Sequence, residues 1–339
     1  MLELVFLGTS ASAPSIQRGL PSQVVLYQDE RFLVDCGEGT QRQILRSGLG
    51  FRRLNRILLT HGHLDHILGL GGLISTFARW ETVDAFEIYG GERTLDRVHD
   101  LLFGVVLRGA RPPVEIDLID AKPGILLESE EFEVRVFDVQ HRGPGCVGYR
   151  FSEKPRRPFL PEQANALGVP AGPVRRDLVN GQSVTRADGR IIHPDDVLGP
   201  DRPGVSIAIT GDNGQVKNLV EAVQGVDILV TEATYLSRDR DMARRFGHTT
   251  ADEAGWLARE AGVRMLVLTH LSQRYRIREI LAEVETYFEP VVAARDFDRF
   301  TVTREKITVT NQQLEEDTEL LAEECAGGDF SDTLGDAAR

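Results

Sequence analysis

The segment that decides the fold reads Thr60-His61-Gly62-His63-Leu64-Asp65-His66. It follows an apolar run at 56–60 that is typical of a buried strand. Alternate residues of an extended chain point the same way, so His61 and His63 share one side, and a turn into a helix directs Asp65 and His66 towards a second point. Imidazole and carboxylate ligands favour Zn²⁺, with Mn²⁺ or Fe²⁺ as weaker alternatives. Because one zinc ion takes three protein ligands and water at a catalytic site, this density of ligands indicates two metal ions.

Three more candidate ligands each follow a predicted strand. They are His141 after 132–140, Asp212 after 206–210 and His270 after 265–269. Ligands of α/β sheets collect at the carboxyl ends of strands, so we expect these side chains to meet the first cluster. The alternative, a solvated polar turn with incidental histidines, explains the first cluster but not the later ones. The sequence therefore predicts a dinuclear metal site.

Strand and helix patterns alternate in two blocks. The predicted strands are 2–7, 23–27, 31–35, 56–60, 86–89, 114–119, 125–128, 132–139, 146–151, 206–210, 227–231, 265–269, 290–293 and 299–303. The predicted helices are 65–79, 92–107, 216–223, 251–261 and 277–288. This alternation indicates an α/β fold in which two packed sheets carry helices on their outer faces. Between the blocks, residues 152–204 are rich in Pro and poor in long apolar runs, so we expect an inserted arm there.

Charge is distributed unevenly along the 339 residues, whose formal net charge is −13. Residues 310–339 hold nine acidic residues and one Arg, a charge of −8, so residues 1–309 carry −5. The end segment is predicted to be a disordered, solubilising tail, with one short acidic helix at 312–325 as an option. A composition of 41% hydrophobic and 27% charged residues excludes fibrous and wholly disordered classes.

Three widely spaced Cys exclude a disulfide framework. The N-terminal segment lacks the basic start and long apolar run of a signal peptide. Since no apolar stretch approaches 18 residues, no membrane span is predicted, and we expect a cytoplasmic protein.

The arm has the local charge of a nucleic-acid handle. Residues 150–190 contain eight bases and four acids, a local charge of +4. Arginine suits bidentate contact with phosphate, and the candidates include Arg156, Arg157, Arg175 and Arg176. The alternative is a solvated basic loop.

The HxHxDH motif with a later His, Asp and His resembles the metallo-β-lactamase superfamily. Further segments resemble its ribonuclease Z family, the tRNA 3′-processing endonucleases. They are Phe6-Leu7-Gly8-Thr9, Asp35-Cys36-Gly37-Glu38-Gly39-Thr40-Gln41, Gly247-His248-Thr249-Thr250, His270-Leu271-Ser272-Gln273-Arg274-Tyr275 and Ala294-Arg295-Asp296. The resemblance covers 1–309 and implies an αβ/βα sandwich with a flexible tRNA-binding arm.

The resemblance also implies two zinc ions per subunit. Its ligand set would be His61, His63 and His141 for one ion, and Asp65, His66 and His270 for the other, with Asp212 bridging. It implies that Asp65 accepts a proton from the attacking water and that His248 donates one to the leaving 3′ oxygen. The alternative is that His248 has only a structural role, as a residue next to the N-cap of the helix predicted at 251–261.

Weaker expectations concern three other residues. Asp35 is predicted to orient a metal-binding His by a hydrogen bond without contacting the metal itself. The alternative is a carboxylate buried in a turn. Arg274 and Tyr275 are predicted to contact the phosphate or the RNA 3′ end, with a structural ion pair as the alternative.

The function that the resemblance implies is endonucleolytic removal of the 3′ trailer from precursor tRNA by a homodimer. The products would be a tRNA 3′-hydroxyl and a trailer 5′-phosphate. Two alternatives remain at this stage: a hydrolase of a small substrate (a cyclic-nucleotide phosphodiesterase, an arylsulfatase-like enzyme or a lactonase) and an inactive RNA-binding protein. The basic arm argues against the first, and the complete ligand set argues against the second.

Overall fold

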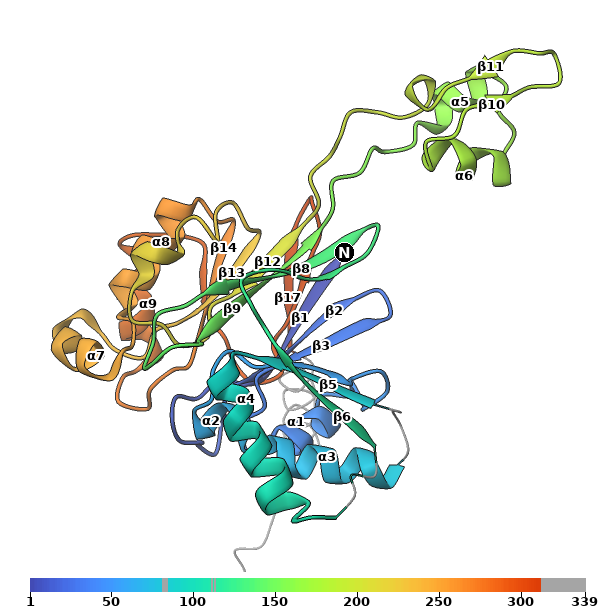
Figure 1. Cartoon of the computed structure of the whole chain (residues 1–339). Helices are drawn as coiled ribbons and strands as arrows, with labels where there is room; N and C mark the ends of the chain where they lie inside the picture. The colour runs from blue at the N-terminus through green and yellow to red at the C-terminus, as the bar shows by residue number, and fades with distance from the viewer. Residues whose placement is uncertain (81–84, 111, 113, 312–339) are drawn as a thin grey trace, which may run out of the picture.

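The computed structural model describes residues 1–80, 85–110, 112 and 114–311. Within these ranges, two β-sheets pack face to face, and helices cover the outer face of each sheet (Figure 1). The arrangement is the αβ/βα sandwich expected from the alternation of strands and helices. A separate small unit projects from the sandwich on two extended strands of chain (Figure 1).

The first sheet has eight strands in the order β17-β16-β1-β2-β3-β4-β5-β6. Their bounds are β1 Leu2–Gly8, β2 Ser22–Tyr27, β3 Glu30–Val34, β4 Arg56–Leu58, β5 Ala85–Gly90, β6 Glu115–Asp120, β16 Arg299–Val302 and β17 Ile307–Thr310. β3, β4, β5 and β6 run parallel, so the loops that follow β3 and β4 leave from the same edge.

The second sheet has seven strands in the order β15-β14-β13-β12-β9-β8-β7. Their bounds are β7 Gly124–Glu128, β8 Phe132–Asp138, β9 Val147–Glu153, β12 Ser206–Ile209, β13 Ile228–Glu232, β14 Met265–Thr269 and β15 Val291–Ala293. β12 to β15 run parallel and present their carboxyl ends at one edge.

Each sheet carries its own set of helices. Those of the first half are α1 Thr40–Arg46, α2 Leu64–Ile67, α3 Gly69–Trp80, α4 Glu92–His99 and a π-helix at Asp100–Val106. Those of the second half are α7 Arg240–Phe246, α8 Ala251–Ala261, α9 Ile277–Glu285 and two 3₁₀ turns, Val216–Leu219 and Ser237–Asp239. α3 packs on the first sheet and α8 on the second through continuous apolar clusters.

The central core lies between the two sheets. Phe32 and Phe300 of the first sheet are fully buried here with Tyr149 and Phe151 of the second. Two hydrogen bonds join the sheets beside this core, because the Tyr149 hydroxyl donates to Leu59 O at 2.8 Å and Val147 N donates to Thr60 O at 2.8 Å. These bonds fix the residues that lead directly into the His-rich segment.

The projecting unit begins where β9 ends and returns at β12. It contains α5 Pro161–Ala166, α6 Pro173–Val179, the hairpin of β10 Val184–Thr185 and β11 Ile191–Ile192, and a 3₁₀ turn at Pro194–Asp196. Ala164, Leu178, Ile192 and Val197 are buried together in a small core of its own. We call residues 154–203 the arm, which lies within the predicted range 152–204.

Several sequence expectations need correction. The helix predicted at 65–79 is two helices, because the chain bends at Leu68 and Gly69 packs on the backbone of Gly37. The helix predicted at 216–223 is a single 3₁₀ turn followed by hydrogen-bonded turns. Helix α1, which the sequence reading missed, begins directly after a glycine-rich turn.

Two further expectations concern the acidic tail and membrane spans. The predicted acidic tail starts at the end of β17, and residues 312–339 lie outside the described residues. Within the residues that are described, no helix combines the length and the apolar character that crossing a bilayer requires.

Candidate metal centre

Seven predicted ligands converge at the edge where parallel strands of both sheets end. His61, His63, Asp65 and His66 come from the loop after β4 and from the first turn of α2. The others follow strands of the second sheet: His141 follows β8, Asp212 follows β12 and His270 follows β14. Because the two sheets supply different ligands, the site lies across the junction of the two halves.

The seven side chains fall into two groups within coordinating distance. The ligand atoms of His61, His63, His141 and Asp212 lie within 4.8 Å of one another, as do those of Asp65, His66 and His270. The closest approach within the first group is 2.9 Å, between His61 Nε2 and His63 Nδ1.

Asp212 lies between the two groups. Its Oδ2 is 3.7 Å from His61 Nε2 and 3.3 Å from His270 Nε2, while its Oδ1 is 3.5 Å from His66 Nε2. One buried carboxylate thus faces both groups, as a bridging ligand must.

In two of the histidines, Nδ1 donates a hydrogen bond to a threonine hydroxyl, and that hydroxyl in turn donates to a carboxylate. Thr60 Oγ1 donates to Asp35, so it accepts a hydrogen bond from His61 Nδ1 at 3.1 Å. Thr234 Oγ1 donates to the buried Glu232 carboxylate and accepts from His270 Nδ1 at 2.8 Å. Since Nδ1 carries the proton in both rings, each Nε2 presents a lone pair to the centre.

Two more of the five imidazoles, those of His66 and His141, are oriented by direct acceptors. His66 Nδ1 donates to Asp35 Oδ2 at 2.8 Å, and His141 Nδ1 donates to Gly247 O at 2.6 Å. Outer hydrogen bonds of this kind fix the tautomer of metal-binding histidines and raise their basicity.

These residues fit a pair of metal ions. Several imidazole lone pairs and two carboxylates are crowded into a buried space, which is unfavourable without cations. His66 Nε2 and Asp212 Oδ1 are buried and have no hydrogen-bond partner among the described residues. Both are atoms that a metal would take as ligands, and the mixture of imidazole and carboxylate suits zinc. The donor set indicates a metal-dependent enzyme.

Electrostatics keep most of these groups in their ligand forms. Burial lowers the pKa of His61 well below its usual value and lowers the pKa of His63 to about 4. Burial opposes ionisation of Asp65, but its hydrogen bond with His270 and the nearby His66 lower its pKa to about 2. The pKa of His66 is raised, because the charges of Asp212 and Asp35 outweigh the effect of burial.

His248 lies beside the two ligand groups and is hydrogen-bonded to Glu232, which belongs to neither group. Its Nδ1 donates to the fully buried carboxylate of Glu232 at 3.0 Å. Burial would lower the pKa of His248, but the charge of Glu232 outweighs it and raises the pKa to about 9. Thr250 and Glu253 form the capping box of α8, so His248 is not needed as a cap. His248 precedes this N-cap by two residues and faces Glu232, whose charge favours the protonated imidazole.

A cavity of about 540 Å³ opens over the centre. His63, Asp65, Asp212 and His248 line it together with Tyr235 and other side chains. The Ser12 backbone N–H, from the loop after β1, reaches Asp65 Oδ2 at 3.1 Å. A substrate in this cavity meets both groups of ligands and His248 at once.

The comparisons with known proteins agree with this geometry. The sequence profile of the Metallo-beta-lactamase superfamily matches residues 18–157. A ribonuclease Z of Bradyrhizobium sp. (strain ORS 278) is 48% identical over 302 residues, which are 89% of this chain and all of that protein. A ribonuclease Z of Methanosarcina acetivorans is 37% identical, covering 87% of this chain and 96% of that protein.

The chain belongs to the ribonuclease Z family.

Solved structures confirm the metallo-β-lactamase fold. The short form of human tRNase Z matches with a TM-score of 0.61 and 25% identity, covering 89% of this chain and 99% of that one. A metallo-β-lactamase fold protein of Bacillus subtilis matches with a TM-score of 0.64 at 18% identity, covering 89% and 100%, and supports the fold alone.

The substrate-contact residues expected for a ribonuclease Z are not all at the cavity. Tyr275 is buried, and its hydroxyl donates to Asp239 Oδ2 at 2.6 Å beneath the guanidinium of Arg238. Arg274 is exposed and directs Nη1 to Met242 Sδ at 3.4 Å. Neither residue lines the cavity over the centre: Tyr275 braces the loop after β14, and Arg274 lies at the surface. Their contact with a substrate stays a prediction.

The four arm arginines divide into two kinds. Arg157 donates to Leu198 O and Gly199 O and pairs with Asp195, so it holds the base of the arm together. Arg175 donates to Val169 O and lies over the ring of Phe159. Arg156 and Arg176 are exposed. Of these four arginines, Arg156 and Arg176 are the ones whose side chains lie at the surface.

Glu232, Thr60 and Thr234 were not singled out from the sequence. Glu232 and Thr234 stand in the run Thr231-Glu232-Ala233-Thr234 at the carboxyl end of a buried strand, the position that identified Asp212 and His270. That position is the signal that could have found them.

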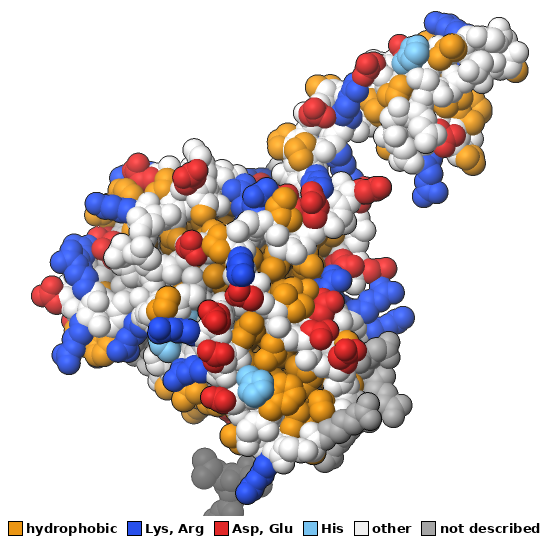
Figure 2. Space-filling model, in the orientation of Figure 1, with side chains coloured by type: hydrophobic (Ala, Val, Ile, Leu, Met, Phe, Trp, Pro, Cys, Tyr) orange, Lys and Arg blue, Asp and Glu red, His pale blue; other side chains and the backbone are white. Residues whose placement is uncertain are grey.

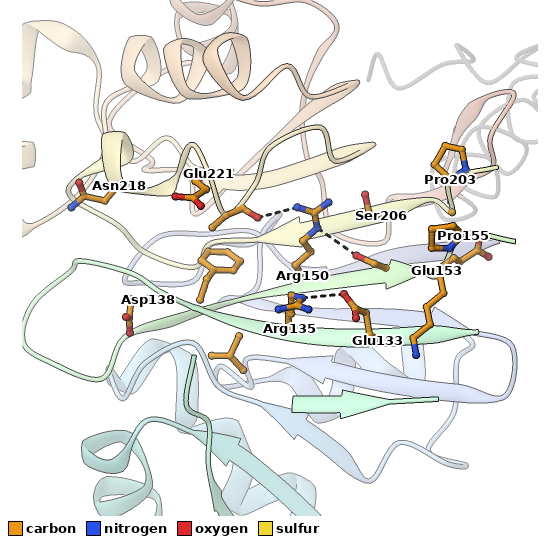
Figure 3. A pocket seen from close by; sticks show the side chains of 16 residues that line it. Glu133, Arg135, Asp138, Arg150, Glu153, Pro155, Pro203, Ser206, Asn218 and Glu221 are labelled. Atoms are coloured by element: carbon orange, nitrogen blue, oxygen red, sulfur yellow. Dashed lines mark hydrogen bonds and ion pairs between the residues drawn. The ribbon is translucent and has the colours of Figure 1, made fainter. Parts of the chain in front are cut away.

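A separate cavity of about 700 Å³ lies on the outer face of β8, β9 and β12, at the root of the arm (Figure 3). Its charged groups satisfy one another: Arg135 pairs with Glu133 at 3.1 Å, and Arg150 donates to Ser152 Oγ and Ala222 O (Figure 3). It holds no metal-ligand group like those of the centre among the described residues.

Proposed function

We propose that this protein removes the 3′ trailer from precursor tRNA by endonucleolytic hydrolysis, leaving a tRNA 3′-hydroxyl and a trailer 5′-phosphate. The observation that carries the proposal is the convergence of two ligand groups and His248 on one cavity. Membership of the ribonuclease Z family supplies the substrate class.

The centre is proposed to hold two Zn²⁺ ions. His61, His63 and His141 would hold one, Asp65, His66 and His270 the other, and Asp212 would bridge. When bound, the pair supplies a water of lowered pKa and positive charge for the transition state of phosphodiester hydrolysis. The ligand shell orients this chemistry through Asp35, Thr60 and Thr234.

Proton transfers are assigned to Asp65 and His248. Asp65 is an ionised carboxylate that lines the cavity, so it can accept the proton of the attacking water. His248 keeps its Nδ1–H on Glu232, and the described residues offer its Nε2 no hydrogen-bond partner. Its Nε2–H is the group that would protonate the leaving 3′ oxygen.

The arm is proposed to hold the body of the tRNA by its backbone. Arg156, Arg176 and Arg190 are exposed on it, and it extends well beyond the sandwich (Figures 1 and 2). Contacts of this kind recognise the shape of folded RNA and weaken with salt. We further propose a cytoplasmic homodimer in which the arm of one subunit serves the other subunit's site.

One experiment tests the function. Purified protein is incubated with 3′-extended precursor tRNA and with a small phosphodiester, and the RNA ends are sequenced. Cleavage at the end of the acceptor stem that His66→Ala abolishes is the expected result. Hydrolysis of the small ester with no cutting of the tRNA would contradict the proposal. Mixing a His66→Ala subunit with an arm-deleted subunit tests the dimer, since activity returns only if arm and site come from different chains.

A further inference from the structure

A second cavity, of about 700 Å³, adjoins the catalytic one. The two share the lining residues His63, Arg97 and Arg142, so they form one continuous hollow beside the metal centre. The second cavity is also lined by His61, Arg93 and the loop before β9. Figure 2 shows Lys and Arg side chains beside a His in the hollow between the α7 side and the α2–α4 side.

Three arginines give this cavity a positive wall. Arg93 and Arg97 are one turn apart on α4, and Arg142 directly follows the candidate ligand His141. We call these three residues the arginine cradle. Arg97 uses Nη1 to donate to Gly62 O at 2.8 Å, and Arg142 lies 5.9 Å from the ring of Phe246.

The cradle lacks compensating anions. No carboxylate pairs with Arg93, Arg97 or Arg142 among the described residues, whereas other arginines such as Arg56, Arg157 and Arg240 do form ion pairs. Asp96 also lines the cavity, but forms no ion pair with the three arginines. Unpaired guanidinium groups in a hollow are typical of sites that take phosphate.

We propose that the arginine cradle binds the first backbone phosphate of the trailer, on the 3′ side of the scissile bond. The proposal rests on the function proposed above. The volume of about 700 Å³ is in the range of sites for small ligands, so the proposed occupant is a short single strand rather than the acceptor stem.

The position of His248 indicates which cavity takes the tRNA end and which takes the trailer. His248 protonates the leaving 3′ oxygen, so the tRNA end lies in the first cavity, which His248 lines. The phosphorus stays bonded to the 5′ oxygen of the trailer. The trailer strand must therefore run from the centre in a direction other than that of the tRNA end. The second cavity is not lined by His248 and begins beside His63 and His61. It therefore offers the trailer a path that is lined by arginines and begins beside the centre.

The test compares precursor tRNAs with trailers of one, two and four nucleotides. A one-nucleotide trailer has only the scissile phosphate, and a two-nucleotide trailer adds the phosphate that the cradle would bind. For the unmodified protein, kcat/KM is expected to rise about tenfold from one to two nucleotides, the effect of one charge-assisted contact. Arg93→Gln/Arg97→Gln is expected to abolish this rise and to lessen the salt dependence for the longer trailers.

Two variants control for folding and for charge. Arg93→Gln alone leaves the bond from Arg97 to Gly62 in place and should lose part of the rise. Arg278→Gln removes an exposed arginine of α9 that lines neither cavity and should keep the whole rise. An undiminished rise in the double variant, or an equal loss on every trailer, would overturn the proposal.

A binding measurement separates this inference from the proposed function. Fluorescence anisotropy with 5′-phosphorylated RNA mononucleotides and dinucleotides needs no cleavage. The zinc-loaded protein is expected to prefer the dinucleotide, and the double variant to lose that preference. Equal binding of both by the unmodified protein would sink the cradle even if precursor tRNA is cut, while failure to cut precursor tRNA would count against the function alone.

Discussion

Glu232 is fully buried and is the charge that raises the pKa of His248 to about 9. His248 must be protonated to act as a donor, so activity persists below this pKa and is lost as pH rises through it. In Glu232→Gln the side chain keeps its size but loses its charge. The pKa of His248 then falls, and we expect the alkaline limb of the kcat/KM profile to move down by at least one pH unit.

The control for this prediction is His248→Ala, which should abolish the limb and lower the rate about 100-fold or more, the usual contribution of a general acid. An alkaline limb at the same pH in the unmodified protein and in Glu232→Gln would show that Glu232 does not set the proton on His248.

Asp35 acts on the centre through His66 Nδ1 and through Thr60. Its backbone is left-handed, with φ 58°. Asn also tolerates this conformation, so Asp35→Asn tests the charge rather than the backbone. We expect zinc affinity to fall about 10- to 100-fold, the usual effect of losing an outer carboxylate, as measured by competition with a chelating dye.

Asp227→Asn is the matched variant for Asp35→Asn. Asp227 accepts a hydrogen bond from Ser206 N at 2.8 Å and pairs with Arg264, at the end of β12 opposite the centre. Its replacement should leave zinc affinity unchanged. Equal losses in both variants would mean that general destabilisation, not the contact with His66, sets the affinity.

At the scale of elements, the junction of α2 and α3 fixes Asp65 and His66. A Cβ on Gly69 would lie 2.1 Å from Gly37 O, a backbone atom that cannot give way easily. Gly69→Ala is therefore expected to lower the free energy of unfolding by about 1–3 kcal/mol, as overpacking does. Zinc binding should weaken as well, because α2 must shift.

Gly104 provides the comparison for Gly69, because a Cβ there meets nothing within 4 Å and the residue is also helical. Gly104→Ala should be neutral or slightly stabilising in the same denaturant titration. Similar losses in both variants would show that helix geometry, rather than the contact with Gly37, explains the effect.

Part of the site and of the helices could be predicted from the sequence. The convergence of the seven candidate ligands was predictable, because closely spaced His and Asp after apolar strands form a strong pattern. Glu232 stands at the carboxyl end of β13, a position that could have singled it out, but its partner His248 lies in another loop and no local spacing links the two. Contact of Tyr275 with the substrate stays a prediction, and the motif around it does not reveal that Asp239 engages its hydroxyl and Arg238 its ring. The break at Gly69 depends on a contact with Gly37, which local helix periodicity cannot contain.

At the scale of the whole molecule, the arm has its own small core and joins the sandwich by two strands of chain (Figure 1). Replacing 157–201 by a short Gly-Ser linker should therefore leave the sandwich folded. We expect cleavage of precursor tRNA to fall by at least about 100-fold, with hydrolysis of a small phosphodiester retained. Loss of both activities would show that the arm supports the centre itself.

The control for the arm deletion is a charge change at fixed shape. Arg156→Gln/Arg176→Gln alters two exposed arm residues and leaves Arg157 and Arg175 to hold the arm together. The slope of log kcat/KM against log salt should become shallower for this variant, and an unchanged slope would exclude these contacts.

The ligands of the centre come from two sheets that otherwise meet through an apolar core. Asp212 belongs to one half and His66 to the other, and they face each other across the junction at 3.5 Å. A bound ion there is a cross-link as well as a reagent, fastening the halves at the edge where the core ends. Chelation should then lower the melting temperature and raise amide exchange first in the loops after β4 and β12.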